Sequence, residues 1–278
     1  MRAAALVRKY WLEVASLAAV FVVFVIPFIF MVLTAAKDRR ESAKLQFSLP
    51  TEWHLVENIQ EVLATQNGIM YTAMVNSLIL TVASVTITVV LSAMVAFVIQ
   101  RRPGRLSSAV MALMIMGLIL PPALVPTIYT LQWLNIYKTL FGLILVEVTQ
   151  LMPFSVLVFR AFVAGIPREL DEAAIMDGAS PLRLFFRVIF PLLRPAIITV
   201  IVVTSVTVYN DFVNPLYFLP GAENVTVQLT LFNFQGQFHN QWHLLFTDVL
   251  LITIPPLIMF MFFQRQIVSG MTTGAIKG

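Results

Sequence analysis

Residues 166–191 read IPRELDEAAIMDGASPLRLFFRVIFP, and local signals in this stretch predict two short helices joined by a turn. Pro167 suits the first turn of a helix, and the three acidic residues that follow it complement the positive end of the helix dipole. Gly178 is typical of the left-handed residue that ends such a helix. These local signals agree with one another on the order helix, turn, helix.

The second helix of this stretch is predicted to have Ser180 as its N-cap, Pro181 as its first residue and Pro191 as its stop. It is amphipathic, with leucine and phenylalanine side chains on one side and two arginines on another. Two interpretations remain open on these grounds. The pair fits a partner's groove, or it lies on the inner leaflet of a membrane with its arginines at the headgroups.

The composition of the whole chain is that of a multi-span membrane protein. The 278 residues are 59% hydrophobic and 12% charged, and the mean hydropathy is +0.88. Too few polar residues remain to cover a soluble enzyme with one core. The chain has no Cys, which excludes disulfides, thiolate metal sites and Cys nucleophiles. The pI near 9.6 is interpreted as a topology signal, so no nucleic-acid partner is expected.

Six stretches have the roughly 20 apolar residues that a membrane-crossing helix needs. None alternates like a strand, so the prediction is an all-α polytopic fold that forms a single transmembrane domain over residues 1–278. A charged loop at 167–194 and a tail at 264–278 complete it. Prolines interrupt several spans and predict kinks. The predicted spans are 14–36, 71–99, 106–131, 140–163, 195–219 and 244–263.

The distribution of Lys and Arg predicts that both termini lie in the cytoplasm. In this orientation most of the 18 Lys and Arg residues fall in cytoplasmic segments, as the positive-inside rule expects. No Lys or Arg occurs from residue 195 to residue 264, so the loop between the last two spans is expected to be external. The basic cluster at 37–44 is the exception, since it falls in the first external loop.

Four polar residues, Tyr209, Asn210, Asp211 and Asn214, lie within the fifth predicted span. An ionised Asp near mid-bilayer costs about 2.5 to 3.5 kcal/mol on insertion scales, so it should face protein or water. Two interpretations stay open. These residues line a substrate pathway, where amides and carboxylates bind hydroxyl groups, or they form interhelical hydrogen bonds between subunits or lie at the external boundary of the membrane.

No arrangement typical of an enzyme is found in the sequence. There is no Gly-x4-Gly-Lys-Ser/Thr phosphate-binding loop, so nucleotide hydrolysis must come from another chain. His239 and His243 have the spacing of a helical metal pair, but no third ligand recurs nearby, so neither a metal site nor a catalytic site is predicted. A proton- or sodium-coupled transporter is disfavoured because it would carry more intramembrane carboxylates.

The charged stretch resembles the EAA loop of ATP-binding-cassette (ABC) importer permeases. That pattern has Glu-Ala-Ala, three residues, Gly, nine residues, Ile, one residue and Leu-Pro. Here residues 172–174 are Glu-Ala-Ala, and Gly178 follows at the right distance. Val188 and Phe190 stand in place of Ile and Leu, and Pro191 matches. This resemblance favours the groove-binding interpretation of the helical pair.

Two further segments narrow the resemblance to carbohydrate permeases. Residues 264–278 read QRQIVSGMTTGAIKG and are similar to the Gln-Arg…Gly-Leu-Thr-x-Gly-Ala-x-Lys-Gly tail of maltose-type permeases, with Met271 in place of Leu. Residues 209–212 resemble their Trp-Asn-Asp-Phe segment, with Tyr209 in place of Trp. The resemblance covers nearly the whole chain and implies the six-span, MetI-like permease fold.

This resemblance implies a non-catalytic subunit of an ATP-driven importer in a bacterial or archaeal cell (inner) membrane. In the family, two homologous permease subunits form one pathway, two cytoplasmic ATPases bind ATP and Mg, and an extracytoplasmic solute-binding protein delivers the sugar. The chain itself is expected to bind no cofactor. A permease for amino acids, polyamines or osmolytes remains the alternative, and the particular sugar is left open.

The resemblance also assigns roles to residues. The helical pair is expected to contact the ATPases and to pass their motion to the fifth span through residues 191–195. A weaker ATPase-facing role falls on Gly270, Thr272, Gly274 and Lys277 in the tail. The coupling residues implied are Glu172, Ala173, Ala174, Asp177, Gly178, Ser180, Pro181, Arg183, Phe185 and Phe186.

Overall fold

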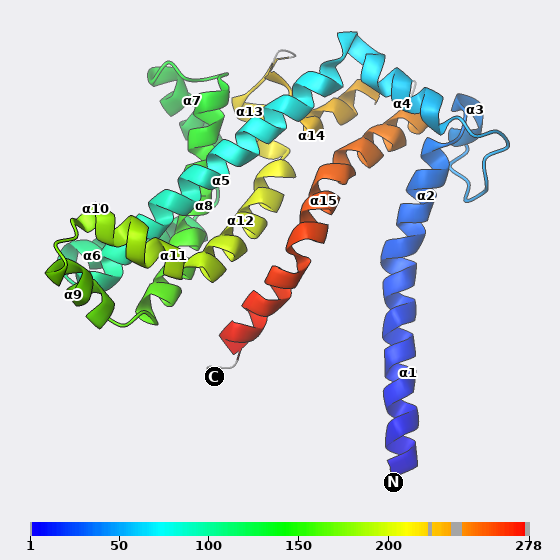
Figure 1. The fold of residues 1–278 in the computed structure, drawn as a ribbon. Coiled ribbons are helices and arrows are strands. Elements are labelled where there is room, and N and C mark those ends of the chain that lie inside the picture. Colours follow the sequence, from blue (N-terminus) through cyan, green and yellow to red (C-terminus); the bar gives the residue numbers. More distant parts are fainter. Residues whose placement is uncertain (1, 222–223, 235–240, 276–278) are drawn as a thin grey trace. The chain divides into compact units, whose positions relative to one another are not determined.

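The computed structural model describes residues 2–221, 224–234 and 241–275, with side chains described from residue 10 to residue 264 within those ranges. These residues form helices joined by loops, and the described ranges contain no strand, which confirms the predicted all-α class (Figure 1). The α-helices and the shorter π- and 3-10 turns (η) are α1 (Arg2–Val20), η1 (Phe21–Val25), α2 (Ile26–Ala35), α3 (Arg39–Ser42), α4 (Leu55–Ala64), η2 (Thr65–Asn67), α5 (Ile69–Arg101), α6 (Arg105–Ile119), α7 (Leu124–Trp133), α8 (Leu140–Ala164), α9 (Glu169–Met176), α10 (Pro181–Leu184), η3 (Phe185–Ile189), α11 (Phe190–Leu192), α12 (Arg194–Tyr209), α13 (Val213–Phe218), α14 (Val227–Thr230), η5 (Leu231–Phe234) and α15 (Trp242–Ala275).

Four helical segments of the described chain are long and apolar enough to cross a membrane. They correspond to the first, second, fourth and sixth predicted spans. Helices α10–α11 and α12 together pass the same test, with a bend of 77° between them, and they supply a fifth crossing if the pair is one span. The four continuous segments are Tyr10–Ala35, Ile69–Arg101, Leu140–Ala164 and Trp242–Gln264.

The third predicted span, residues 106–131, is interrupted more strongly than a kink. Helix α6 ends at Ile119, and α7 begins at Leu124. Pro121 and Pro122 lie between them, and each proline lacks an N–H and disfavours helical backbone in the residue before it. The sequence predicts a kink in this span, whereas the structure has two separate helices. By contrast, Pro153 lies inside the continuous helix α8.

The fifth predicted span, residues 195–219, is shorter than expected as a continuous helix. Helix α12 ends at Tyr209, and the separate helix α13 follows. The Asp211 carboxylate accepts hydrogen bonds from the backbone N–H groups of Val213, at 2.9 Å, and of Asn214, at 3.3 Å. Such a side chain offers the backbone an alternative to continuing a helix, which explains why the predicted span divides here.

The chain forms two compact units, of which the first contains residues 1–71 and 230–254. Buried polar contacts hold the loop that follows α2. Lys37, only 1% exposed, donates from Nζ to the Gln46 carbonyl at 2.7 Å and to Ser48 Oγ at 3.0 Å. Asn58 on α4 donates from Nδ2 to the carbonyls of Ala35, at 2.8 Å, and Lys37, at 2.9 Å. These bonds fasten the loop to α4.

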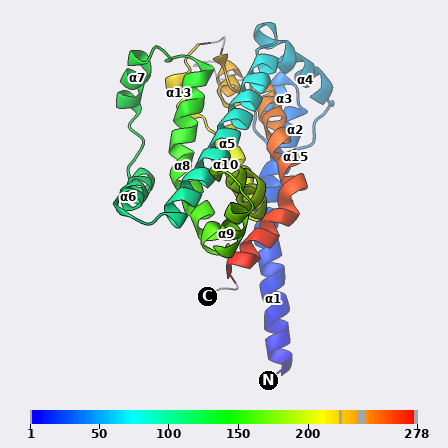
Figure 2. The same ribbon diagram turned by 60° about the vertical axis from the view of Figure 1, so that its left-hand side comes forward.

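The second unit contains residues 72–229 and 255–278. Helix α8 packs against α6, α12 and α13. One apolar cluster joins α5, α8 and α12 to the α9–α11 segment, and it includes Phe159, Ile189 and Val200. A second cluster lies near α13 and includes Leu143 and Phe218. Figures 1 and 2 show the α9–α11 segment at one end of α5 and α8, and α13 at the other end. Two candidate sites lie at these two ends.

Candidate functional site

The turn between α9 and α10 has the geometry that the sequence predicts. Gly178 has a φ of +75°, in the left-handed region. Its N–H donates to the Ile175 carbonyl at 2.9 Å, and the Ala179 N–H donates to the Ala174 carbonyl at 2.9 Å. This pair of bonds is the Schellman ending of a helix, so α9 stops here through its own backbone.

The start of α10 also follows the prediction, whereas its end does not. The Ser180 hydroxyl accepts from the Arg183 N–H at 3.4 Å, and Pro181 is the first residue of the helix. The predicted stop at Pro191 is early by one residue, because the helical stretch ends at Leu192. Pro191 lies in the first turn of α11, where a missing N–H is tolerated, and the change of direction comes after Leu192.

The helical pair has a buried side and an exposed side. Ala174 and Phe185 are buried, and the Phe185 ring lies 5.7 Å from the ring of Phe97 on α5, measured between centroids. The other residues that the resemblance marks as coupling residues face outward. They are Glu172, Ala173, Asp177, Gly178, Ser180, Pro181, Arg183 and Phe186.

An ion pair connects the end of α5 to α9. Arg101 Nε lies 2.6 Å from Asp171 Oδ2, in a contact that is an ion pair and not an aligned hydrogen bond. Arg101 Nη2 donates to Asp171 Oδ1 at 3.3 Å and to the Ile166 carbonyl at 3.0 Å. The guanidinium thus contacts both α9 and the connection that precedes it.

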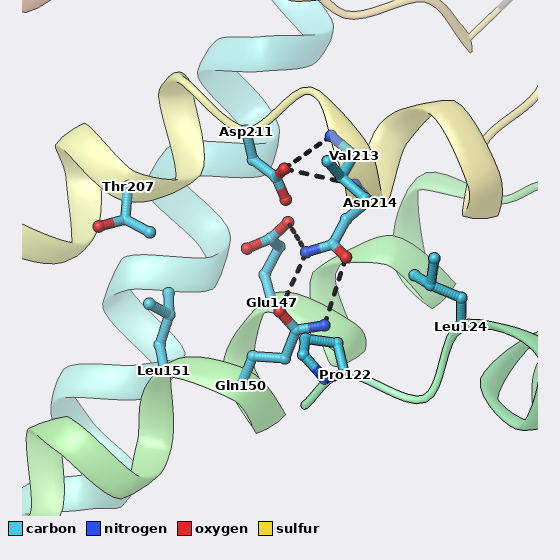
Figure 3. A pocket seen from close by; sticks show the side chains of 9 residues that line it. All are labelled: Pro122, Leu124, Glu147, Gln150, Leu151, Thr207, Asp211, Val213 and Asn214. Atoms are coloured by element: carbon cyan, nitrogen blue, oxygen red, sulfur yellow. Dashed lines mark hydrogen bonds between the residues drawn. The ribbon is translucent and has the colours of Figure 1, made fainter. Parts of the chain in front are cut away.

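The second candidate site is a cavity of about 450 Å³ at the other end of the second unit (Figure 3). Side chains of α8, of the break between α6 and α7, and of the α12–α13 junction line it. Its walls combine polar groups with aliphatic ones. The lining residues are Pro122, Leu124, Glu147, Gln150, Leu151, Thr207, Asp211, Val213 and Asn214.

A hydrogen-bonded cluster forms the polar side of this cavity. Asn214 donates from Nδ2 to Glu147 Oε1 at 3.1 Å and to Gln150 Oε1 at 3.2 Å. Gln150 Nε2 donates back to Asn214 Oδ1 at 3.3 Å, so the two amides bond reciprocally. The carboxyl groups of Glu147 and Asp211 face each other (Figure 3). Carboxyl and amide groups of this kind form hydrogen bonds with hydroxyl groups.

Of the four polar residues that the sequence identifies in the fifth span, two line the cavity and two do not. Asp211 and Asn214 lie in the cavity wall. The Tyr209 carbonyl and Asn210 Oδ1 each accept from Gln228 Nε2 at 3.4 Å, and neither residue is among those that line the cavity. These two residues instead join the end of α12 to the segment that contains α14.

Sequence reasoning missed Glu147 and Gln150. Glu147 is 2% exposed and is an acidic residue inside the apolar helix α8. An acidic residue within a membrane-crossing segment is by itself a signal for a functional position, and that signal was available in the sequence.

A second cavity, of about 400 Å³, adjoins Gln150. Thr127, Thr130 and Thr149 line it together with aliphatic side chains of α7, α8 and the connection between them. Gln150 lines both cavities. Within the described ranges, no group of three or more His, Asp or Glu side chains is arranged to hold a metal ion.

The tail residues have no described side-chain contacts to assess. Gly270, Thr272 and Gly274 lie on α15, where only the backbone is described, and Lys277 lies outside the described residues.

The sequence matches a protein family described as binding-protein-dependent transport system inner membrane component, over residues 88–273. The probable ABC transporter permease protein YurM of Bacillus subtilis is 30% identical over 277 residues, which cover 98% of this chain and 91% of that one. The melibiose/raffinose/stachyose import permease protein MelC of the same bacterium is 29% identical over 91% of each chain.

The fold is similar to that of a chain in a crystal structure of a bacterial ABC transporter involved in the import of the acidic polysaccharide alginate. The TM-score is 0.78 at 17% identity, and the match covers 95% of this chain and 96% of that one. The match supports the MetI-like permease fold that the sequence predicts.

Proposed function

Because the chain belongs to the family of binding-protein-dependent transport system inner membrane components, we propose that it is the permease subunit of an ABC importer that carries a carbohydrate into the cytoplasm. The observation that carries the proposal is the family match over residues 88–273, which includes both the helical pair and the polar cavity. The carbohydrate part is supported by MelC, a relative named for oligosaccharide import.

The exposed side of the helical pair is the proposed contact with the ATPase subunits. Its small residues Ala173 and Gly178 permit close approach of a groove wall, and Arg183 can pair with a carboxylate of the partner. The opposite side is fixed to the bundle through Phe185. A rigid projection of this kind transmits force from a partner because its own packing does not change.

The polar cavity is the proposed section of the solute pathway. Carboxylates and amides bond sugar hydroxyls, and the aliphatic wall around Leu124 and Leu151 suits the C–H face of a sugar ring. Hydrogen-bonding groups of this kind, with no Lys or Arg among the described residues that line the cavity, favour a neutral saccharide over a uronate, whose carboxylate would find no cationic partner in this wall.

The remaining partners follow from this role. A second homologous permease subunit completes the pathway, two cytoplasmic ATPases bind ATP and Mg, and an extracytoplasmic binding protein delivers the solute. Both termini are proposed to lie in the cytoplasm, supported by the distribution of Lys and Arg. In this orientation the helical pair is on the cytoplasmic side, where the ATPases are.

Co-purification tests the proposal. The tagged full-length chain, extracted in mild detergent from membranes of the cell that produces it, should retain a second permease and an ATP-binding subunit. Ala173→Arg adds bulk and charge to the exposed side of α9 and should reduce the retained ATPase at least tenfold. Ala164→Arg, on an exposed residue that ends α8, is the matched control and should retain it.

Two results would contradict the proposal. One is a wild-type chain that elutes without any ATP-binding subunit, and the other is an Ala173→Arg variant that retains as much ATPase as the wild type. Uptake by proteoliposomes that contain the whole complex and its binding protein tests the solute. ATP-dependent uptake of an amino acid, polyamine or osmolyte in place of a saccharide would overturn the carbohydrate part alone.

A further inference from the structure

The covalent connection from the helical pair to α12 is poorly suited to pass on a movement. After α10 the chain forms the π-helical turn η3 and the three-residue helix α11, and it then bends by 77° into α12. A π-turn and a sharp bend are points where a helix departs from a straight rod. A push on α9 and α10 that travels along the backbone is therefore partly absorbed before it reaches α12, which otherwise contacts this segment through the shared apolar cluster.

Side-chain contacts provide a second connection, from the pair to α5. Arg101 holds Asp171 through both carboxylate oxygens and holds the Ile166 carbonyl as well. The Arg101 and Asp171 side chains are only 11% and 13% exposed, so water screens the pair weakly. A two-point contact between guanidinium and carboxylate also fixes orientation, which a single contact does not.

Phe97 adds a contact from the same face of α5. It lies four residues before Arg101, one helical turn away, and its ring packs on Phe185 at the start of η3. The last turns of α5 thus contact both halves of the pair, α9 through Arg101 and the α10–η3 junction through Phe97.

Helix α5 reaches from this end of the second unit to the other. It runs from Ile69 to Arg101 without a proline. Near its first turns, Asn76 Nδ2 donates to the Val225 carbonyl at 3.1 Å, and Ser77 Oγ accepts from the Val227 N–H at 3.0 Å. At 1.5 Å per residue, the contacts at Asn76 and at Arg101 are about 37 Å apart, more than the thickness of the hydrocarbon layer.

We infer that α5 is the element that carries a movement of the helical pair across the membrane to residues 225–227, and that Arg101 is the positioning residue that attaches it to the pair. The inference rests on the proposed function, in which the pair contacts the ATPases. Because coupling between two sites is reciprocal, a change at residues 225–227 also acts on the pair through the same helix.

Variants of the ion pair test this role in the reconstituted complex with its ATPases and binding protein. Arg101→Met should leave the co-purified ATPase and its basal hydrolysis in place and lower the stimulation by loaded binding protein at least about 5-fold, the low end of coupling between sites. Asp171→Asn should act in the same direction, and the exchange Arg101→Asp with Asp171→Arg should restore part of the stimulation. Arg101→Lys should lose less than Arg101→Met, since it keeps the charge.

Arg160 offers a matched control. It is a basic residue on α8 that donates from Nε to Gln100 Oε1 at 3.1 Å, next to Arg101 on α5, and within the described residues its side chain forms no hydrogen bond or ion pair with the helical pair. Arg160→Met should leave the stimulation unchanged. If Arg101→Met stays fully stimulated in a complex whose wild type responds to binding protein, the inference is overturned and the proposed function stands. A wild-type complex without a response overturns the proposed function itself.

A distance measurement tests the inference without disturbing the ion pair. The chain has no Cys, so cysteines for spin labels can be introduced without removing native ones from it. Labels replace Met176, 87% exposed on α9, together with either the exposed Val98 on α5 or the exposed Val203 on α12. When ATP binds, the 176–98 distance should stay constant and the 176–203 distance should shift. A 176–98 shift as large as the 176–203 shift would overturn the inference.

Discussion

The Gly178 position allows the stability of the helical pair to be altered by a known amount. A Cβ added at Gly178 meets no atom within 4 Å, so steric contact contributes nothing to the effect of a substitution. The φ of +75° remains, and a residue with a Cβ pays about 1 to 2 kcal/mol in the left-handed region. Gly178→Ala should therefore raise the population of the opened turn about 5- to 30-fold.

Hydrogen exchange of the purified complex measures this opening. The amides of Gly178 and Ala179 are protected by their bonds to the Ile175 and Ala174 carbonyls, and both should exchange about 5 to 30 times faster in Gly178→Ala. Gly178→Asn should lie between the wild type and the Ala variant, because Asn enters the left-handed region more readily than Ala.

Gly104 is the matched control for this experiment. A Cβ there also meets no atom within 4 Å, but its φ of 169° is extended backbone that any residue adopts. Gly104→Ala should leave exchange around residue 178 unchanged. The reasoning fails if the two amides exchange at the wild-type rate in Gly178→Ala, or if Gly104→Ala accelerates them equally.

Three other substitutions have expected outcomes. Glu147→Gln keeps an oxygen acceptor for the buried Asn214 amide, so the yield of folded complex should stay at the wild-type level while saccharide uptake into proteoliposomes falls. Uptake at the wild-type rate would show that Glu147 is not part of the pathway. Gly142→Ala would place a Cβ 2.2 Å from the Ile136 carbonyl oxygen, which forces backbone movement at a cost of about 1 to 3 kcal/mol, and heating of the detergent-solubilised chain should show a lower melting temperature. Lys37→Met removes the two hydrogen bonds that the buried ammonium donates to the Gln46 carbonyl and to Ser48 Oγ, and bonds to a charged group are worth about 1.5 to 3 kcal/mol, so the melting temperature should fall. Lys44→Met, on an exposed side chain, should not change it, and equal effects would argue against the buried lysine as a structural contact.

The features predicted best from the sequence are those set by near neighbours in the chain. Gly178 ends α9, and Ser180 caps α10, because each choice depends on backbone groups only a few residues away. Four of the six predicted spans follow the same logic, since length and composition decide them. The end of the second helix was harder to place, because Pro191 is tolerated where a new helical turn begins.

The polar cavity shows what local patterns leave out. Glu147 and Asn214 form a hydrogen bond although they lie 67 positions apart in the sequence. The sequence around either residue does not predict that the two side chains meet. The break after Tyr209 also changes which residues share a face. A helix continued through this point would group Asn210 with Asn214, whereas the actual turn at Asp211 separates them. Tertiary pairing, and not propensity, decides such sites.

The interruption between α6 and α7 has a consequence for how the molecule meets its lipids. At 1.5 Å per residue the two helices measure about 22 Å and 15 Å, so neither one alone crosses a hydrocarbon layer of about 30 Å. The peptide groups exposed between them need hydrogen-bond partners, and acyl chains supply none. This part of the chain must therefore border water or a neighbouring polypeptide. Because Pro122 and Leu124 also line the acidic cavity, we expect water or a neighbouring polypeptide, and not acyl chains, at that wall of the cavity.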